Sequence, residues 1–379
     1  MSEAARAFRW VERTAAPPSH LALLEKAVAL HPGRGDALER YGVALTERQR
    51  HGEAIAPLEA ALAVREGEFT AWRPLAAAYA ATGRPQEALD AAIRGGITEL
   101  RGIALLALGR VDEGRAILRA DVLSGGPPSA LTALMRALVR EPDPAPVLEI
   151  LDSLPPPLAR TATARGYRAI ALSRAGRHAE ARRLVDLERH VLQIPFAPPA
   201  PFGDGFNGAL AADILAMSSS ADAARDGTDI RYDPPSRKSR ALGALYAFVR
   251  SGMERWVGEM AARGLGAVMP PPPPSAQLYS ANTILTGDGR NGEHIHGIGY
   301  VSAVYHVRVP AGDGGDLVLG CCARTTGGYA PCWGTRHITP REGCLTLFPS
   351  HVFHDVVPTG LATPRISVAC DMIPLWDRS

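Results

Sequence analysis

Histidines are concentrated in one part of the sequence, at a spacing that could bind a metal ion. The chain has 11 histidines, and six of them lie between residues 294 and 354. His294 and His296 stand two positions apart directly before a predicted strand, so on extended backbone both imidazoles point to the same side. His354 follows a predicted buried strand and a proline turn. Two neighbouring ligands and a third from a distant strand are typical of a facial metal site in a β-barrel.

A second pair of residues could bind a carboxylate. Arg365 and Ser367 also stand two positions apart in a predicted strand, shortly after His354. A guanidinium group binds a carboxylate through two parallel hydrogen bonds, which is more specific than the point charge of a lysine. Arg-x-Ser alone is a common pattern. On the strand that follows a metal-binding histidine, it predicts an anion site beside the metal.

The elements that must position these side chains are predicted to be β-strands with helices before them. Residues 207–217 and 241–263 have the apolar spacing of helices. After the proline run 270–274 the period changes to two. The predicted strands are Ser280–Thr286, Tyr300–Val309, Asp316–Gly320, Cys344–Phe348 and Arg365–Met372. We expect a barrel or jelly roll backed by helices. Two polar loops, 218–238 and 312–337, are expected to border a substrate site.

The first half of the chain repeats with a period of 34 residues. Residues 37–45 align with 71–79, and the apolar and small positions coincide. Such pairs of helices stack on their neighbours because one pair cannot bury its apolar face alone. This half resembles tetratricopeptide repeats, strongly in two copies and weakly in later ones, and implies an α-solenoid.

A proline-rich segment separates the two halves of the chain. Residues 195–201 contain four prolines and cannot continue a helix. The sequence therefore predicts an α+β chain of two domains, a helical repeat domain over 1–194 and a β domain over 195–379.

Composition excludes several classes of protein. Hydrophobic residues make up 46% of the chain and charged residues 21%, which excludes a mainly disordered chain. The formal net charge of +2 is too small for a protein that must neutralise many phosphates, so no nucleic-acid partner is expected. No apolar run approaches the roughly 20 residues that cross a bilayer. No secretory signal is visible at the start of the chain, so we expect a cytoplasmic protein without a membrane partner.

The second half of the chain also resembles a known family of enzymes. Residues from about 202 to 374 resemble the iron(II)- and 2-oxoglutarate-dependent oxygenases, and in particular one family of them that is often fused behind tetratricopeptide repeats. Three segments carry the resemblance, in order: His294-Ile-His296 with Tyr305-His306-Val, then Leu-Phe348-Pro-Ser350 with His354, then Arg365-Ile-Ser-Val-Ala-Cys-Asp371.

The resemblance implies a double-stranded β-helix with iron held by His294 and His354. It places Arg365, together with Ser367, on the distal carboxylate of 2-oxoglutarate. The wider superfamily has Asp or Glu where this chain has His296. Either His296 completes a three-histidine site, which we favour, or water fills that position. His306 stands where the family has a tyrosine that helps to hold 2-oxoglutarate, and it could donate in its place.

The implied activity is oxygenation that uses Fe(II), 2-oxoglutarate and O₂. Hydroxylation of an unactivated C–H bond in a small-molecule or peptide substrate is the expected outcome, with release of succinate and CO₂. Two alternatives stay open. One is a cupin-type three-histidine metalloenzyme without 2-oxoglutarate. The segment from Gly343 to His354, which contains His351, is similar in sequence to a cupin signature. The other is a repeat scaffold with an inactive barrel, whose repeats bind a protein partner or form a homodimer.

Overall fold

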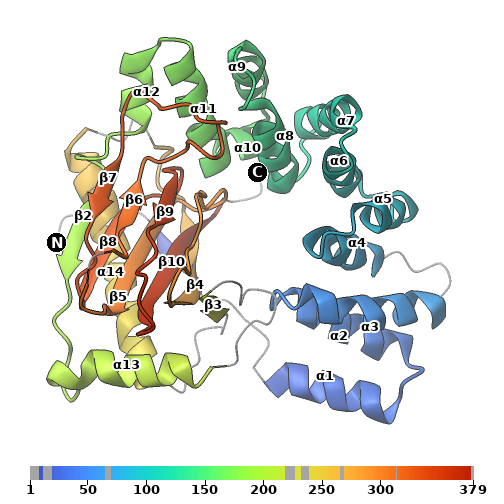
Figure 1. Ribbon diagram of the computed structural model, residues 1–379, viewed down its shortest axis with the longest axis horizontal. Coiled ribbons are helices and arrows are strands. Elements are labelled where there is room, and N and C mark those ends of the chain that lie inside the picture. Colours follow the sequence, from blue (N-terminus) through green and yellow to red (C-terminus); the bar gives the residue numbers. More distant parts are fainter. Residues whose placement is uncertain are drawn as a thin grey trace.

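The chain folds into an N-terminal helical region and a C-terminal β region (Figure 1). The computed structural model describes residues 8–11, 19–64, 70–217, 227–231, 239–264, 269–312 and 314–376. Across these ranges, every helix is too short or too polar to cross a membrane.

Twelve helices are described in the N-terminal region, and most of them pack against the next helix along the chain (Figure 1). They are α1 (Ser19–Leu30), α2 (Gly35–Thr46), α3 (His51–Val64), α4 (Trp72–Ala81), α5 (Pro85–Arg94), α6 (Thr98–Ala107), α7 (Val111–Leu123), α8 (Pro128–Leu138), α9 (Ala145–Asp152), α10 (Pro156–Ala159), α11 (Ala162–Arg174) and α12 (His178–Leu184).

Glycines let the helices of two pairs approach closely. A Cβ atom at Gly42 of α2 would lie 2.5 Å from the Leu58 side chain of α3. A Cβ atom at Gly102 of α6 would lie 2.6 Å from the Leu118 side chain of α7. Both leucines are fully buried. The same small-to-large contact therefore recurs in two helix pairs, which explains why small residues repeat in this half of the sequence.

Two sheets form the β region. The strands are β1 (Arg9–Trp10), β2 (Leu192–Pro195), β3 (Thr228–Arg231), β4 (Ser275–Leu285), β5 (Val301–Arg308), β6 (Leu317–Leu319), β7 (Arg336–Ile338), β8 (Cys344–Pro349), β9 (His354–Val356) and β10 (Arg365–Leu375). The larger sheet has the order β1-β4-β10-β5-β8-β2, with β3 also paired to β4, and the smaller has the order β7-β6-β9. Leu285 and Phe348 of the larger sheet share one apolar cluster with Leu317 and Val356 of the smaller sheet. The sheets therefore curl around a common interior, consistent with a double-stranded β-helix.

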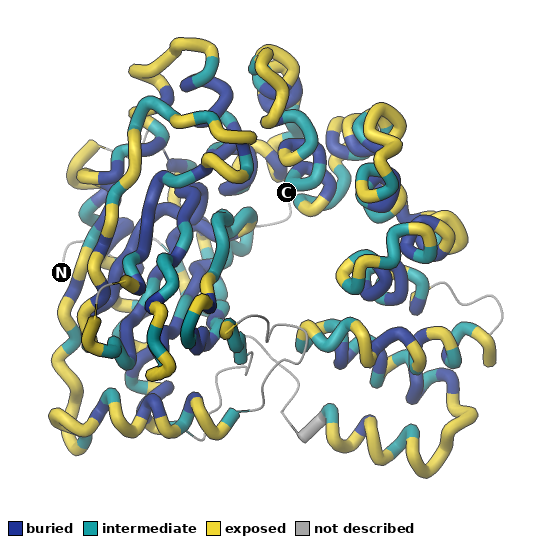
Figure 2. Tube along the Cα trace, viewed as in Figure 1, coloured by how far each residue is buried: buried dark blue, intermediate teal, exposed yellow. Residues whose placement is uncertain are grey.

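In β5 and β10, apolar side chains that pack in the core alternate with side chains on the opposite face of the sheet. Val301, Tyr305 and Val368 face a core shared with helices α13 (Phe206–Leu215) and α14 (Arg240–Ala262). The alternate positions of β5 and β10 include Ser302, His306, Ser367 and Asp371, whose side chains point to the opposite side of the sheet. The strands at the centre of the larger sheet are buried along most of their length (Figure 2).

The five predicted strands are present, and the structure adds shorter ones. β4 begins at Ser275, five residues before the predicted start. β7 and β9 have three residues each, too few for an alternating pattern to be visible in the sequence. In the loop expected over 218–238, the described residues 227–231 carry β3, and the rest lies outside the described residues.

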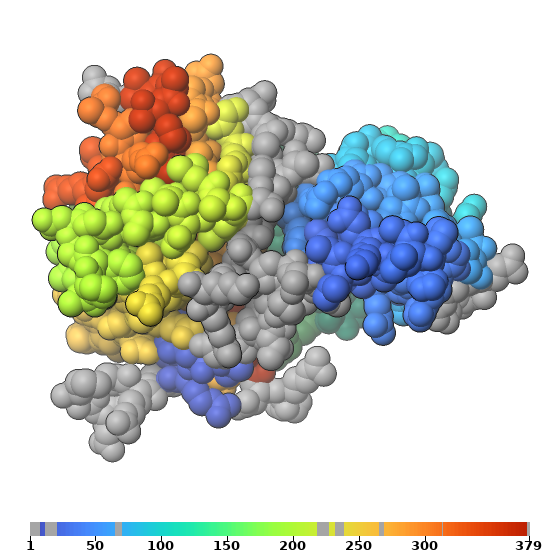
Figure 3. Space-filling view, turned by 90° about the horizontal axis from the view of Figure 1, so that it is seen from below, coloured from blue at the N-terminus to red at the C-terminus, as the bar shows by residue number. Residues whose placement is uncertain are grey.

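The helical region contacts the β region through α11 and the loop that follows β6. Ser173 of α11 bonds the hydroxyl of Tyr329 at 2.7 Å and accepts from the backbone N–H of Cys332 at 2.9 Å. Arg174 donates to the carbonyl of Thr326 at 2.8 Å. Much of the 312–337 loop is thus held against a helix. Viewed from below, helices α1–α3 and helix α13 lie on separate sides of the molecule (Figure 3).

Candidate metal centre

Three imidazoles converge at one end of the space between the sheets. The Nε2 atom of His296 lies 3.2 Å from the Nε2 atom of His294 and 3.2 Å from that of His354. One ligand atom from each ring fits within 4.8 Å of the other two. His294 is bridged to His354 through the backbone, although neither His294 nor His296 lies in a regular strand as their spacing suggested. An extended segment beside β9 achieves the same convergence.

Each imidazole is oriented by its other nitrogen. Nδ1 of His294 lies 2.6 Å from the carbonyl of Gly292, and Nδ1 of His354 lies 3.0 Å from the carbonyl of Val352. Nδ1 of His296 lies 2.5 Å from a carboxylate oxygen of Asp371. Because these acceptors all require a proton on Nδ1, the three Nε2 atoms present lone pairs to one another. Such second contacts are typical of metal-ligating histidines.

The donor set fits a divalent transition metal. Imidazole nitrogens lie about 2.1 Å from such metals, so ligands at right angles stand about 3.0 Å apart. The observed separations of 3.2 Å agree with that spacing. Three lone pairs facing one another without a proton between them are otherwise unfavourable, and a cation removes the conflict.

Burial keeps two of the rings neutral. Burial, aided by the neighbouring His296, lowers the pKa of His294 to about 4. Burial and the two other imidazoles hold the pKa of His354 well below its usual value. Burial also opposes the charged form of His296, but the carboxylate of Asp371 raises the pKa of His296 above its ordinary value.

Asp371 places a negative charge beside the three imidazoles. Its second carboxylate oxygen accepts from the hydroxyl of Ser302 at 2.7 Å, and Ser302 also bonds Ser350 at 2.9 Å. Asp371 is 5% exposed. Sequence reasoning assigned no role to this residue, although it lies on the same face of β10 as Arg365 and Ser367, at even spacings. That alternation was the available signal.

A buried guanidinium lies at the other end of the same cavity. Arg365 is 1% exposed. Its Nη1 donates to Ser367 Oγ at 3.4 Å, and its Nη2 lies 3.4 Å from Nδ1 of His306. The pairing of Ser367 with His306 in the ladder between β10 and β5 brings the three side chains together. Burial lowers the pKa of Arg365 to about 10, and burial beside Arg365 lowers the pKa of His306 to about 3.

The polar atoms at this end fit an acidic ligand. Nε of Arg365 and Nε2 of His306 are buried without a hydrogen-bond partner among the described residues. Buried polar atoms are normally paired, so orphaned atoms beside a cavity indicate a missing polar ligand. A neutral His306 and a charged Arg365 can both donate to a carboxylate.

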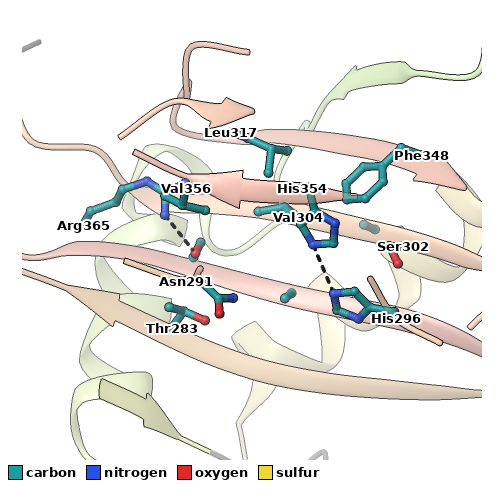
Figure 4. Close-up of a pocket in the computed structure, with 13 residues that line it drawn as sticks. Thr283, Asn291, His296, Ser302, Val304, Leu317, Phe348, His354, Val356 and Arg365 are labelled. Atoms are coloured by element: carbon teal, nitrogen blue, oxygen red, sulfur yellow. Dashed lines mark hydrogen bonds between the residues drawn. The ribbon is translucent and has the colours of Figure 1, made fainter. Parts of the chain in front are cut away.

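The two ends face each other across one narrow cavity (Figure 4). Arg365 lies at one end and the rings of His296 and His354 lie at the other. The side chains of Thr283 and Asn291 lie between them. The sequence pattern gave no sign of these two residues, because neither belongs to a recognisable motif. Phe348 packs edge-on against His354, with ring centroids 4.9 Å apart.

Two residues close to His354 in the sequence, His351 and Asp355, do not point toward the three converging imidazoles. His351 is buried, and its Nε2 lies 2.7 Å from the carbonyl of Leu184 in the helical region. Asp355 pairs with Arg290 at the surface of β9. The convergence is therefore limited to His294, His296 and His354.

Comparison with known proteins adds a family match over the part of the chain that holds this cavity. Residues 282–371 match the model of the family described as "Putative 2OG-Fe(II) oxygenase". No curated protein matches the chain.

Several solved structures are similar to about half of the chain. A Pseudomonas putida prolyl-4-hydroxylase is 18% identical, covers 52% of this chain and 99% of its own, and has a TM-score of 0.36. A 2OG-Fe(II) oxygenase family oxidoreductase from Burkholderia pseudomallei is 15% identical, with 51% and 89% covered and a TM-score of 0.34. HygX from Streptomyces hygroscopicus, solved with nickel, 2-oxoglutarate and hygromycin B, is 14% identical, with 51% and 86% covered and a TM-score of 0.32.

Proposed function

We propose that the chain is an Fe(II)/2-oxoglutarate-dependent oxygenase, as the family match over residues 282–371 supports, and that His294, His296 and His354 hold its iron. We propose further that Arg365, with Ser367 and His306, holds the distal carboxylate of 2-oxoglutarate. The single observation that carries both assignments is that His296 and His354, which converge with His294, line the same cavity as the buried guanidinium of Arg365.

At the iron end, the three histidine rings are already oriented for metal binding. Their Nδ1 contacts fix each ring before a metal arrives, which lowers the cost of ordering the site. Asp371 stabilises positive charge on His296 through its carboxylate, so the site keeps a compensating negative charge outside the ligand set. This arrangement supports ligation by His296 rather than by water.

At the other end, Arg365 selects and orients the cosubstrate. Its fork can bind both oxygens of a carboxylate, while Ser367 and His306 limit its rotation. Asn291 and Thr283 flank the path between the two ends and can hydrogen-bond the middle of a bound keto-diacid. Leu317, Phe348 and Val356 cover the cavity with apolar surface and exclude water.

The proposed reaction is hydroxylation of an unactivated C–H bond. When bound, Fe(II), 2-oxoglutarate and O₂ supply the oxidant, and the products are hydroxylated substrate, succinate and CO₂. The residues of the chain position the substrate carbon and keep bulk water from the site.

Succinate formation coupled to O₂ uptake tests this function. The purified protein, loaded anaerobically with Fe(II), should bind 2-oxoglutarate and release succinate when O₂ is admitted. O₂ uptake without dependence on 2-oxoglutarate would favour a cupin-type three-histidine enzyme. Absence of both metal and 2-oxoglutarate binding would favour a scaffold with an inactive barrel. The orphaned atoms of Arg365 and His306 support the first outcome.

For the helical region, we propose a tetratricopeptide-like solenoid that ends near residue 194. The packing of most helices against the next helix along the chain supports this proposal. So do the positive φ angles of Gly83, Gly109 and Gly176, each at a turn between two helices.

A further inference from the structure

We propose that the groove between helix α8 and the iron-site loop binds an acidic segment of a polypeptide and is the substrate channel of this oxygenase. The proposal rests on the function above and narrows its substrate class to proteins or peptides. The groove has a volume of about 1290 Å³. Small-molecule pockets usually have about 300–1,000 Å³, so the volume of this groove is larger than one small ligand needs.

One face of α8 forms the first wall of the groove. On α8, Ser129, Ala133 and Ala137 follow one another at intervals of four residues, as do Thr132 and Arg136, and Arg140 lies in the turn just after the helix. These rows lie on adjacent stripes of the same helix face. Ile103 and Leu106 of α6 continue the wall with apolar surface. In Figure 1, α8 lies between the β region and helices α6 and α7.

The iron-site loop forms the second wall. Glu293, Gly297 and Ile298 line the groove, and they flank two of the proposed iron ligands in the sequence. The carbonyl of Gly297 accepts from the backbone N–H of Thr163 at 3.0 Å, which ties this loop to α11. Ile298 is 52% exposed. A chain in the groove would therefore contact the segment that carries His294 and His296.

The charge of the groove is positive. Four arginines line it, and Glu293 is the sole acidic side chain among the lining residues that the structure describes. The carboxylate of Glu293 accepts from the backbone N–H groups of Arg324 and Thr325, at 3.1 and 2.7 Å. Its charge is thus directed into the loop.

Two of the four arginines have no counter-ion among the residues that the structure describes. Arg115 pairs with Glu141, and Arg324 lies 3.5 Å from Asp355. Within the described ranges, neither Arg136 nor Arg140 forms an ion pair, and both are exposed. Their uncompensated charge would attract carboxylates.

The apolar part of the lining favours a peptide over a nucleic acid. Ile103, Leu106, Val111 and Ile298 offer aliphatic surface between the arginines. Single-stranded nucleic acids are usually bound by aromatic side chains on which bases stack, and the described lining contains none. Alternating aliphatic and cationic surface matches a chain with acidic and aliphatic side chains.

A labelled peptide tests the proposal directly. The probe is a fluorescent peptide of about 12 residues alternating Glu and Leu, which reaches roughly 40 Å when extended. Its binding to the full chain is measured by fluorescence polarisation at low and moderate salt. We expect binding that weakens with salt and falls about tenfold in the R136E/R140E double variant. R40E reverses the charge of one exposed arginine of α2 outside the groove and should leave binding unchanged.

Photocrosslinking places the bound peptide independently of any variant. A benzophenone group in the same probe should label α6, α8 or residues 293–298. The proposal would be overturned if a Lys–Leu peptide bound as tightly as the Glu–Leu peptide, or if oligo-dT bound more tightly. It would also be overturned if R40E weakened binding as much as R136E/R140E, or if the crosslinks lay outside these segments.

Measurements of peptide binding and of 2-oxoglutarate binding distinguish a failure of the groove proposal from a failure of the proposed function. If the metal-loaded protein binds 2-oxoglutarate but not the acidic peptide, the groove proposal is wrong and the oxygenase assignment stands. If the peptide binds in the groove but no 2-oxoglutarate binds in the presence of metal, the proposed function is wrong and the groove remains a peptide site.

Discussion

The two ends of the cavity differ in how completely the protein itself satisfies them. At the histidine end, each Nδ1 has a partner within the chain, so the rings are held whether or not a metal is present. At the arginine end, the contacts of Arg365 are long, and atoms of Arg365 and His306 have no partner among the described residues. One end is thus preorganised, and the other is completed by its ligand.

This difference indicates an order of assembly. A preset metal site can bind its ion first, because little conformational entropy is lost. The arginine end gains hydrogen bonds only when a carboxylate enters. Changes at the histidine end should therefore abolish metal binding, and changes at the arginine end should weaken 2-oxoglutarate while the metal stays bound.

The largest effect is expected from His354→Ala. Loss of one of three imidazoles removes the metal, whose contribution of several kcal/mol corresponds to at least about 10³-fold in rate. Metal content by atomic emission and succinate release should both fall to background. His178→Ala, which removes an exposed imidazole from α12, serves as the control and should keep both. Full metal occupancy in His354→Ala would refute the assignment.

Arg365→Lys should separate the two ends. A lysine keeps the charge but loses the fork, and a hydrogen bond to a charged group contributes about 1.5–3 kcal/mol. The KM for 2-oxoglutarate should rise about 10- to 100-fold, with unchanged metal content. Arg341→Lys makes the same change at an exposed position and should alter neither quantity. An unchanged KM in Arg365→Lys contradicts a role for the guanidinium in cosubstrate binding.

Asp371→Asn tests the charge behind the histidine end. The amide keeps nearly the same shape but removes the negative charge that His296 contacts, so metal affinity should fall about 10- to 100-fold. Isothermal titration with Ni²⁺ or Co²⁺ measures this directly, without turnover. Asp288→Asn, at an exposed turn, is the matched control. If the two variants bind metal equally, Asp371 has a structural role only.

The sequence predicted the convergence at both ends for different reasons. Arg365 and Ser367 share a face because β10 is a regular strand. The segment of His294 and His296 is not a regular strand. The two rings still converge, because a backbone bridge between His294 and His354 holds this segment extended.

What the sequence could not reveal depends on register between distant segments. The contact of His296 with Asp371 joins positions 75 residues apart, and the position of β2 at the edge of β8 joins residues 192–195 to 344–347. Neither pairing leaves a local pattern. The docking of Tyr329 on α11 likewise requires tertiary structure.

The smallest effect concerns a buried imidazole outside the cavity, His351. Burial lowers the pKa of His351 to about 3, below the ordinary value of 6.5. The unfolded chain therefore binds a proton that the folded chain excludes, and stability is fully present above pH 6.5 and is lost as the pH falls toward 3. This group adds a slope of at most about 1.4 kcal/mol per pH unit to the free energy of unfolding. Denaturant unfolding of the metal-free protein at pH 7 and pH 5 measures the slope.

His351→Gln distinguishes this group from the cavity histidines. A glutamine amide can still donate to the carbonyl of Leu184 but does not titrate, so the loss of stability between pH 7 and pH 5 should become smaller. His31→Gln, at an exposed position, should keep the wild-type slope. Metal binding should be unchanged in both variants, since His351 makes its contact with the helical region and not with the metal site. A slope in His351→Gln equal to that of the wild type would mean that other buried groups, such as His190, dominate acid unfolding.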